Sequence, residues 1–106
     1  MYRQDGTPLT ESYRDWLIES LKDPKEAAGY LTACLEDGDP DVFLLALRDV
    51  AEAFGGIAKL SKKTRLNREN LYRMLSKRGN PELYSLDKLL HALGFCLSVQ
   101  VSKKAA

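Results

Sequence analysis

The sequence predicts a mainly α-helical protein of five to six short helices, with a helix-turn-helix unit and one short C-terminal β-strand. Two Asp–Pro pairs, beginning at Asp23 and Asp39, are typical helix starts. Apolar residues recur at helical spacing along most of the chain, whereas residues 95–101 alternate with period two. The 106 residues suit one compact domain, and no apolar run approaches the ~18 residues of a membrane span. We expect a cytoplasmic protein, because the polar N-terminus lacks the apolar stretch of a secretory signal.

The first three predicted helices follow from local start and stop signals. Residues 10–21 place apolar side chains at helical spacing, and Trp16 among them is expected to pack in the core. The second helix starts at the first Asp–Pro pair and ends near Gly38, which suits a left-handed C-terminal turn. The third starts at the second Asp–Pro pair and is stopped by the glycines at 55–56. These elements form an acidic N-terminal region, residues 1–54.

The elements of residues 55–106 are shorter. Residues 57–64 form a predicted two-turn helix, and residues 65–67 form a tight connection. Asn67 is a good N-cap for a helix over residues 68–77. Ser85 is expected to cap a last helix that is rich in leucine.

Residues 95–101 are β-branched or aromatic enough for a strand. A single strand needs a partner, which is either the same strand of a second subunit or the short segment 2–4. Four apolar side chains share one face of the predicted strand, and we therefore expect a homodimer whose contact includes Phe95, Leu97, Val99 and Val101.

Charge separates the two halves. Residues 1–54 hold 5 basic and 12 acidic side chains, a net charge of −7, and residues 55–106 hold 11 basic and 3 acidic side chains, a net charge of +8. The basic half suits a polyanion, because Lys and Arg on phosphates release condensed counterions. The acidic half would repel DNA and attract a basic protein, although its charge could also serve solubility alone.

The segment 57–75 predicts DNA binding. Two short helices joined by a tight turn match a helix-turn-helix unit, whose second helix enters the major groove. The expected base-reading side chains are Asn67, Arg68, Glu69, Tyr72 and Arg73. The expected phosphate-contacting side chains are Lys59, Lys62, Lys63, Lys77 and Arg78. The turn departs from the usual pattern, because Arg65 stands where glycine favours a positive φ.

Catalysis, cofactors and metals are not expected. His91 is the one histidine and falls on the side of its helix away from the leucines, and no serine has an evident base beside it. A Gly-rich phosphate loop is absent. Two cysteines with one histidine do not suffice for a structural zinc site, and Cys34 and Cys96 are expected to be buried thiols.

Six segments in order resemble the addiction-module antidote proteins of the helix-turn-helix type, the HigA-like antitoxins with a Cro/repressor-type DNA-binding unit. They are residues 21–31 (LKDPKEAAGYL), 35–40 (LEDGDP), 47–52 (LRDVAE), 66–76 (LNRENLYRMLS), 79–81 (GNP) and 89–94 (LLHALG). The resemblance covers roughly residues 18–100.

The resemblance implies an antitoxin that neutralises a small basic RelE/HigB-like ribonuclease toxin and represses its own operon as a dimer on operator DNA. The acidic half would then face the toxin, with Glu11, Asp15 and Glu19 as the expected contacts. The candidate aromatic anchors for the toxin are Tyr13, Trp16 and Tyr30. For Trp16, however, packing in the core is the expected role. The alternative is a stand-alone transcriptional regulator without a toxin, and a protein-interaction module that has lost DNA binding is a third possibility.

Overall fold

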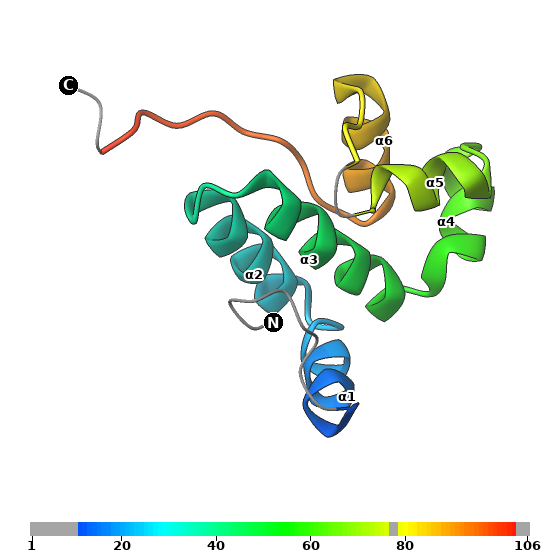
Figure 1. Ribbon diagram of the computed structural model, residues 1–106, viewed down its shortest axis with the longest axis horizontal. Helices are drawn as coiled ribbons and strands as arrows, with labels where there is room; N and C mark the ends of the chain where they lie inside the picture. Colours follow the sequence, from blue (N-terminus) through cyan, green and yellow to red (C-terminus); the bar gives the residue numbers. More distant parts are fainter. Residues whose placement is uncertain (1–10, 77–78, 104–106) are drawn as a thin grey trace.

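The structure, a computed structural model, describes residues 11–76 and 79–103. Within these ranges the chain forms six helices and no strand, which confirms the mainly α-helical prediction (Figure 1). The helices are α1 (Glu11–Ser20), α2 (Pro24–Glu36), α3 (Pro40–Ala53), α4 (Gly56–Thr64), α5 (Arg68–Met74) and α6 (Leu83–Ala92).

Local capping defines the starts of α2 and α3, as predicted. The carboxylate of Asp23 accepts a hydrogen bond from the backbone N–H of Lys25, at 3.0 Å, and Asp39 accepts one from Asp41 at 2.9 Å. Each aspartate caps a helix whose first residue is proline, where the absence of an N–H costs nothing. Gly38, which follows α2, has the expected positive φ of 86°.

The core is one cluster to which every helix contributes, and α3 is its centre. Seven residues of α3 are buried, and this helix packs against α1, α2 and α4. Leu47, Val50 and Ala51 of α3 are fully buried, as are Leu71 of α5 and Leu89 of α6. Because all of these leucines and valines leave water, burial of apolar surface is the main force that holds the helices together.

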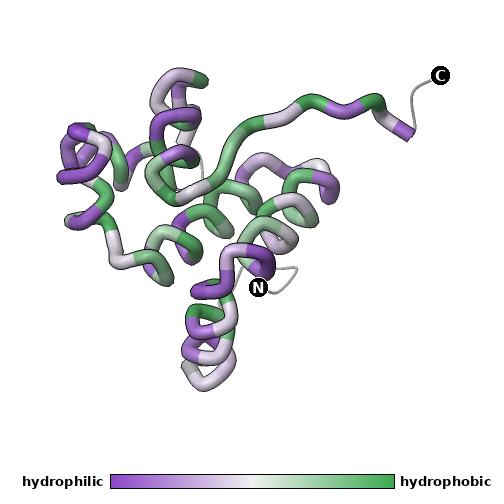
Figure 2. The backbone as a smooth tube through the Cα atoms, turned by 180° about the vertical axis from the view of Figure 1, so that it is seen from behind, coloured by the Kyte–Doolittle hydropathy of each residue, from purple (hydrophilic) through white to green (hydrophobic). Residues whose placement is uncertain are grey.

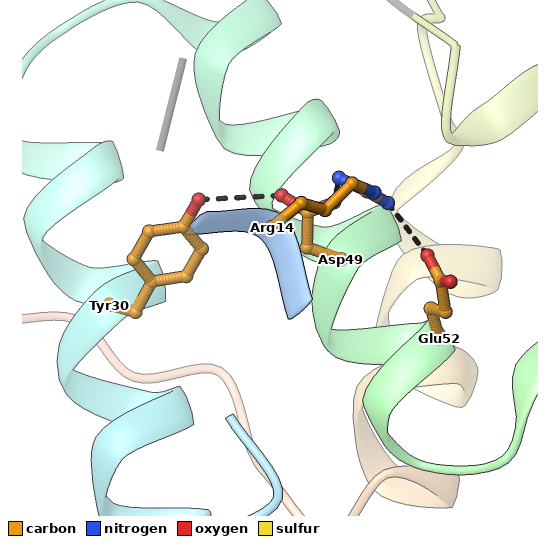
Figure 3. A network of polar contacts seen from close by, with 4 residues as sticks. All are labelled: Arg14, Tyr30, Asp49 and Glu52. Atoms are coloured by element: carbon orange, nitrogen blue, oxygen red, sulfur yellow. Dashed lines mark hydrogen bonds and ion pairs between the residues drawn. The ribbon is translucent and has the colours of Figure 1, made fainter. Parts of the chain in front are cut away.

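One buried carboxylate fastens α1 to α3 (Figure 3). Asp49 of α3 is fully buried and accepts hydrogen bonds from the guanidinium of Arg14, at 2.8 Å, and from the hydroxyl of Tyr30, at 3.4 Å. The other arm of Arg14 donates to Glu52 at 2.6 Å. Burial disfavours the charge on Arg14, but the hydrogen bonds and charges of Asp49 and Glu52 outweigh it and raise the pKa of the guanidinium.

The predicted strand over residues 95–101 is not observed. Residues 95–101 leave the helices as an extended chain that forms no strand within the described ranges (Figure 1). Hydrophilic and hydrophobic residues do alternate along it (Figure 2), so the sequence pattern is real. A strand requires a second chain segment to complete its hydrogen bonds, and the described part of this chain supplies none. The alternative partner, segment 2–4, lies outside the described residues.

Three smaller predictions are wrong. Helix α6 begins at Leu83, and Glu82 is its N-cap without a side-chain hydrogen bond, so Ser85 lies inside the first turn and is not the cap. The apolar pattern does not indicate this first turn, because Leu83 and Tyr84 are 70% and 74% exposed and so do not belong to a buried face.

Helix α5 ends at Met74, three residues before the predicted end at residue 77. Cys34 is buried as expected, but Cys96 is exposed because it lies on the projecting segment.

No helix among the described residues is long and apolar enough to cross a membrane.

Candidate nucleic-acid interface

Helices α4 and α5 are joined by residues 65–67, a turn that is held by hydrogen bonds from both sides. The hydroxyl of Ser61 donates to the carbonyl oxygen of Leu66 at 2.7 Å. The buried hydroxyl of Thr64 donates to the carbonyl oxygen of Leu60 at 2.7 Å and accepts from the N–H of Leu66 at 3.1 Å. The turn is thus fixed by small polar side chains, which matches the predicted tight connection.

Arg65 ends α4 in the left-handed conformation, with a φ of 62°, and it is the one non-glycine residue with positive φ in the described chain. A side chain at this φ carries strain, as the departure from glycine in the sequence indicated. The N–H of Arg65 still donates to the carbonyl oxygen of Ser61, at 2.9 Å, and this bond closes α4.

Helix α5 begins where the sequence placed it. The side chain of Asn67 accepts a hydrogen bond from the N–H of Asn70 at 2.8 Å, which satisfies one of the unpaired donors of the first turn. Leu71 and Met74 are buried against α4 and the core, so the opposite side of α5 faces solvent. The predicted base-reading side chains all lie on this exposed surface: Asn67, Arg68, Glu69, Tyr72 and Arg73.

Arg48 of α3 joins this surface, although the sequence analysis missed it. Its guanidinium carbon lies 5.8 Å from the centre of the Tyr72 ring, within the range of a cation–π contact. Arg48 belongs to the acidic half by sequence, and no local pattern links it to α5. Only the packing of α3 beside the helix-turn-helix unit brings the two side chains together.

Of the predicted phosphate-contacting side chains, the three lysines of α4, Lys59, Lys62 and Lys63, are exposed. Lys59 and Lys63, one helical turn apart on α4, line an open hollow of about 570 Å³ together with Lys22 and His91. Lys62 lies outside that hollow. Lys77 and Arg78 lie outside the described residues. Lys59 and Lys63 thus line a hollow that Lys62 does not line.

The expected partner contacts of the acidic half lie on α1. Asp15 and Glu19 are exposed there, whereas the side chain of Glu11 lies outside the described residues. Trp16 is 61% exposed, so its expected place in the core is wrong. Leu17 of α1 and Leu21, the residue directly after the helix, are buried, whereas the Trp16 side chain lies largely in solvent. Tyr30 is half-buried beside Asp49, so it is a poor anchor.

The four apolar residues of the expected dimer contact have different environments. Phe95 packs on Phe54, with ring centres 5.8 Å apart, and its N–H donates to the carbonyl oxygen of Leu90. Leu97 is 40% exposed, and Val99 and Val101 are almost fully exposed. Phe95 therefore belongs to the core of its own chain, and the two valines remain available.

The described residues contain no group of three His, Cys, Asp or Glu side chains that could hold a metal ion.

Comparison with known proteins gives the chain a family. A family model described as "Probable addiction module antidote protein" matches residues 14–101. An uncharacterised protein of Haemophilus influenzae is 32% identical over 98 residues, which cover 92% of this chain and all of the relative. No solved structure matches the chain significantly. The match over most of the chain shows that this protein belongs to the family of probable addiction module antidote proteins.

Proposed function

We propose that the protein is a non-catalytic antidote of the HigA-like type, which neutralises a RelE/HigB-like toxin and represses its own operon by binding operator DNA. The α4–α5 unit is the observation that supports DNA binding. Its second helix is anchored by Leu71 and Met74 and exposes Arg68, Tyr72 and Arg73 on one side. A recognition helix presents its side chains to base edges in this way.

The contacts on DNA divide into two kinds. Arg68 and Arg73 suit guanine, because a guanidinium can donate two hydrogen bonds to one base edge. Lys62 suits a phosphate, which it would contact whatever the base sequence. Arg48 would support this surface by its contact with Tyr72.

A homodimer would let two recognition helices reach successive major grooves, about 34–36 Å apart. The exposed Val99 and Val101 supply the proposed contact, since an extended apolar segment gains both backbone pairing and burial from a second copy. Phe95 and Cys96, at the root of this segment, line an apolar hollow of about 410 Å³ that could receive side chains of the second copy.

The toxin is proposed to be a basic protein bound by the acidic half. Residues 1–54 carry a net charge of −7, and helix-capping explains only a few of the aspartates. Opposite charges on two partners speed their association and exclude wrong partners. One chain can thereby address a basic protein and a polyanion with separate surfaces.

Titration of operator and unrelated duplexes at several salt concentrations tests the DNA-binding part. Arg73→Ala should weaken operator binding by about 1–3 kcal/mol and reduce discrimination, whereas Lys62→Ala should weaken all duplexes alike and lower the salt dependence. Equal operator affinity of the wild-type protein and Arg73→Ala would contradict the assignment of α5.

Neutralisation of a toxin is tested with the product of the gene adjacent to this one. Its binding is measured with the purified proteins, and growth arrest is measured in cells that express it with and without this protein. Binding together with relief of growth arrest supports an antidote. A neighbour that neither binds nor arrests growth would instead favour a stand-alone regulator.

A further inference from the structure

We propose that the outer face of α1 is the toxin-docking surface and that Trp16 is its main anchor. This face consists of Tyr13, Asp15, Trp16 and Glu19, and we call it the α1 face. The inference rests on the proposed function, because it assumes a basic toxin, but it names the residues that hold that partner.

The aromatic side chains of the α1 face are exposed to solvent. Trp16 is 61% and Tyr13 is 37% exposed, and their ring centres lie 5.5 Å apart at a tilt of 50°. By contrast, Leu17 of the same helix and Leu21, the residue directly after it, are only 7% and 2% exposed. Aromatic side chains have few rotatable bonds, so they lose little conformational entropy when a partner covers them. Tryptophan and tyrosine are the residue types most enriched among the energetically dominant contacts of protein interfaces.

The charge around these rings is acidic, because the helix turns its one cation inward. Arg14 is the single Lys or Arg in α1, and it is held by Asp49 and Glu52 of α3 (Figure 3). Asp15 has no ion-pair partner among the residues the structure describes, and Glu19 shares its charge with Lys22 at 2.7 Å. That pair is exposed on both sides, so water screens it and Glu19 keeps much of its attraction for other cations.

A surface that combines exposed aromatic rings with carboxylates fits a partner rich in arginine and lysine. A guanidinium can stack on an indole ring and pair with a neighbouring carboxylate at the same time. Nucleic acid would also stack on exposed rings, but its phosphates would be repelled by Asp15 and Glu19. A second copy that packed symmetrically through the same face would bring like charges together. The chemistry therefore selects a basic protein.

The position of α1 suits simultaneous binding of toxin and DNA. Helix α1 lies at one end of the molecule, away from α5 (Figure 1), and it packs mainly against α3. A toxin seated on the α1 face therefore leaves α5 uncovered.

Trp16 is the only tryptophan in the chain, so its fluorescence reports directly on this face. The experiment titrates the full-length protein with the product of the adjacent gene, using a toxin variant without tryptophan. We expect a blue shift of the emission on binding, because the toxin would exclude water from the indole ring.

Matched variants separate the anchor from other exposed aromatic side chains. Trp16→Ala should raise the Kd for the toxin at least about 30-fold, mainly through faster dissociation. Trp16→Phe should have a smaller effect. Tyr84→Ala is the control, since Tyr84 is 74% exposed on α6 and should change the Kd less than about 2-fold. Asp15→Lys with Glu19→Lys should slow association at low salt, and the effect should shrink as salt rises.

The outcomes distinguish this inference from the proposed function. Operator binding and the melting temperature of Trp16→Ala should match the wild type, which would exclude misfolding. If the toxin binds Trp16→Ala with the wild-type Kd, or leaves the emission of Trp16 unchanged, the α1 face is not the docking surface although the protein is an antidote. If Trp16→Ala alters self-association instead, the face is a contact between copies. If the wild type binds no toxin at all, the proposed function fails first.

Discussion

The buried ion pair between Arg14 and Asp49 allows a quantitative test of how α1 is attached. Arg14→Met keeps most of the apolar stem of the side chain and removes the guanidinium, so the carboxylate of Asp49 loses its ion pair with Arg14 while it stays fully buried. Removal of one member of a fully buried pair costs ~3–5 kcal/mol, because the remaining charge is neither solvated nor paired.

The expected loss is smaller here, because the Arg14 side chain is 35% exposed. We expect Arg14→Met to lower the free energy of unfolding by about 2–3 kcal/mol, after allowance for partial solvation. For a domain near this size the melting temperature should fall by roughly 10 °C or more. Glu52→Gln removes the other arm of the same guanidinium, but Glu52 is 56% exposed, so its loss should cost less than about 1 kcal/mol.

Urea denaturation followed by far-ultraviolet circular dichroism measures both changes. A double variant, Arg14→Met with Asp49→Leu, should be more stable than Arg14→Met alone, because it also removes the buried carboxylate that has lost its ion pair with Arg14. The reasoning is refuted if Glu52→Gln destabilises the protein as much as Arg14→Met. It is equally refuted if Arg14→Met remains within about 0.5 kcal/mol of the wild type.

Three further outcomes are expected. Arg65→Gly should stabilise the protein by about 0.5–1 kcal/mol in thermal unfolding, since relief of ~1–2 kcal/mol of left-handed strain exceeds the added freedom of the unfolded chain, and Arg65→Ala should not. Cys96 should react with a thiol reagent at once, whereas Cys34 should react only on unfolding, because burial raises the pKa of its thiol. Val99→Asp with Val101→Asp should shift a dimer to monomers in sedimentation equilibrium without lowering the melting temperature; an unchanged dimer would exclude the C-terminal segment from the contact.

The helices of this protein were predictable where a short stretch of chain decides the structure. Asp23, Asp39 and Asn67 cap their helices through hydrogen bonds that span two or three residues, and the sequence alone contains both partners. The tight connection after α4 was predictable for the same reason, whereas the sequence only raised the question of strain at Arg65, whose φ is 62°.

The predictions that were wrong or missing concern packing between residues that are distant in the sequence. Spacing places Trp16 near the apolar side of α1, but the space available over α3 is filled by Leu17 and Leu21, and the indole is left outside. The strand at 95–101 has the right residues, but a strand depends on a partner that the pattern cannot reveal. The contact between Arg48 and Tyr72 joins residues that no local rule relates.

Helix α3 connects the two proposed binding surfaces through consecutive residues. Asp49 is buried and fastens α1 by way of Arg14, whereas Arg48, the residue before it, is exposed and lies over Tyr72 of α5. Neighbouring residues on a helix point about 100° apart, so one turn of α3 reaches both helices. The sequence changes from acidic to basic near Gly55, but the acidic and basic surfaces of the folded protein do not meet at that residue. Arg48 adds its charge to the basic surface, Arg14 is consumed in the core contact, and the outer face of α1 becomes more acidic than the composition of residues 1–54 alone implies.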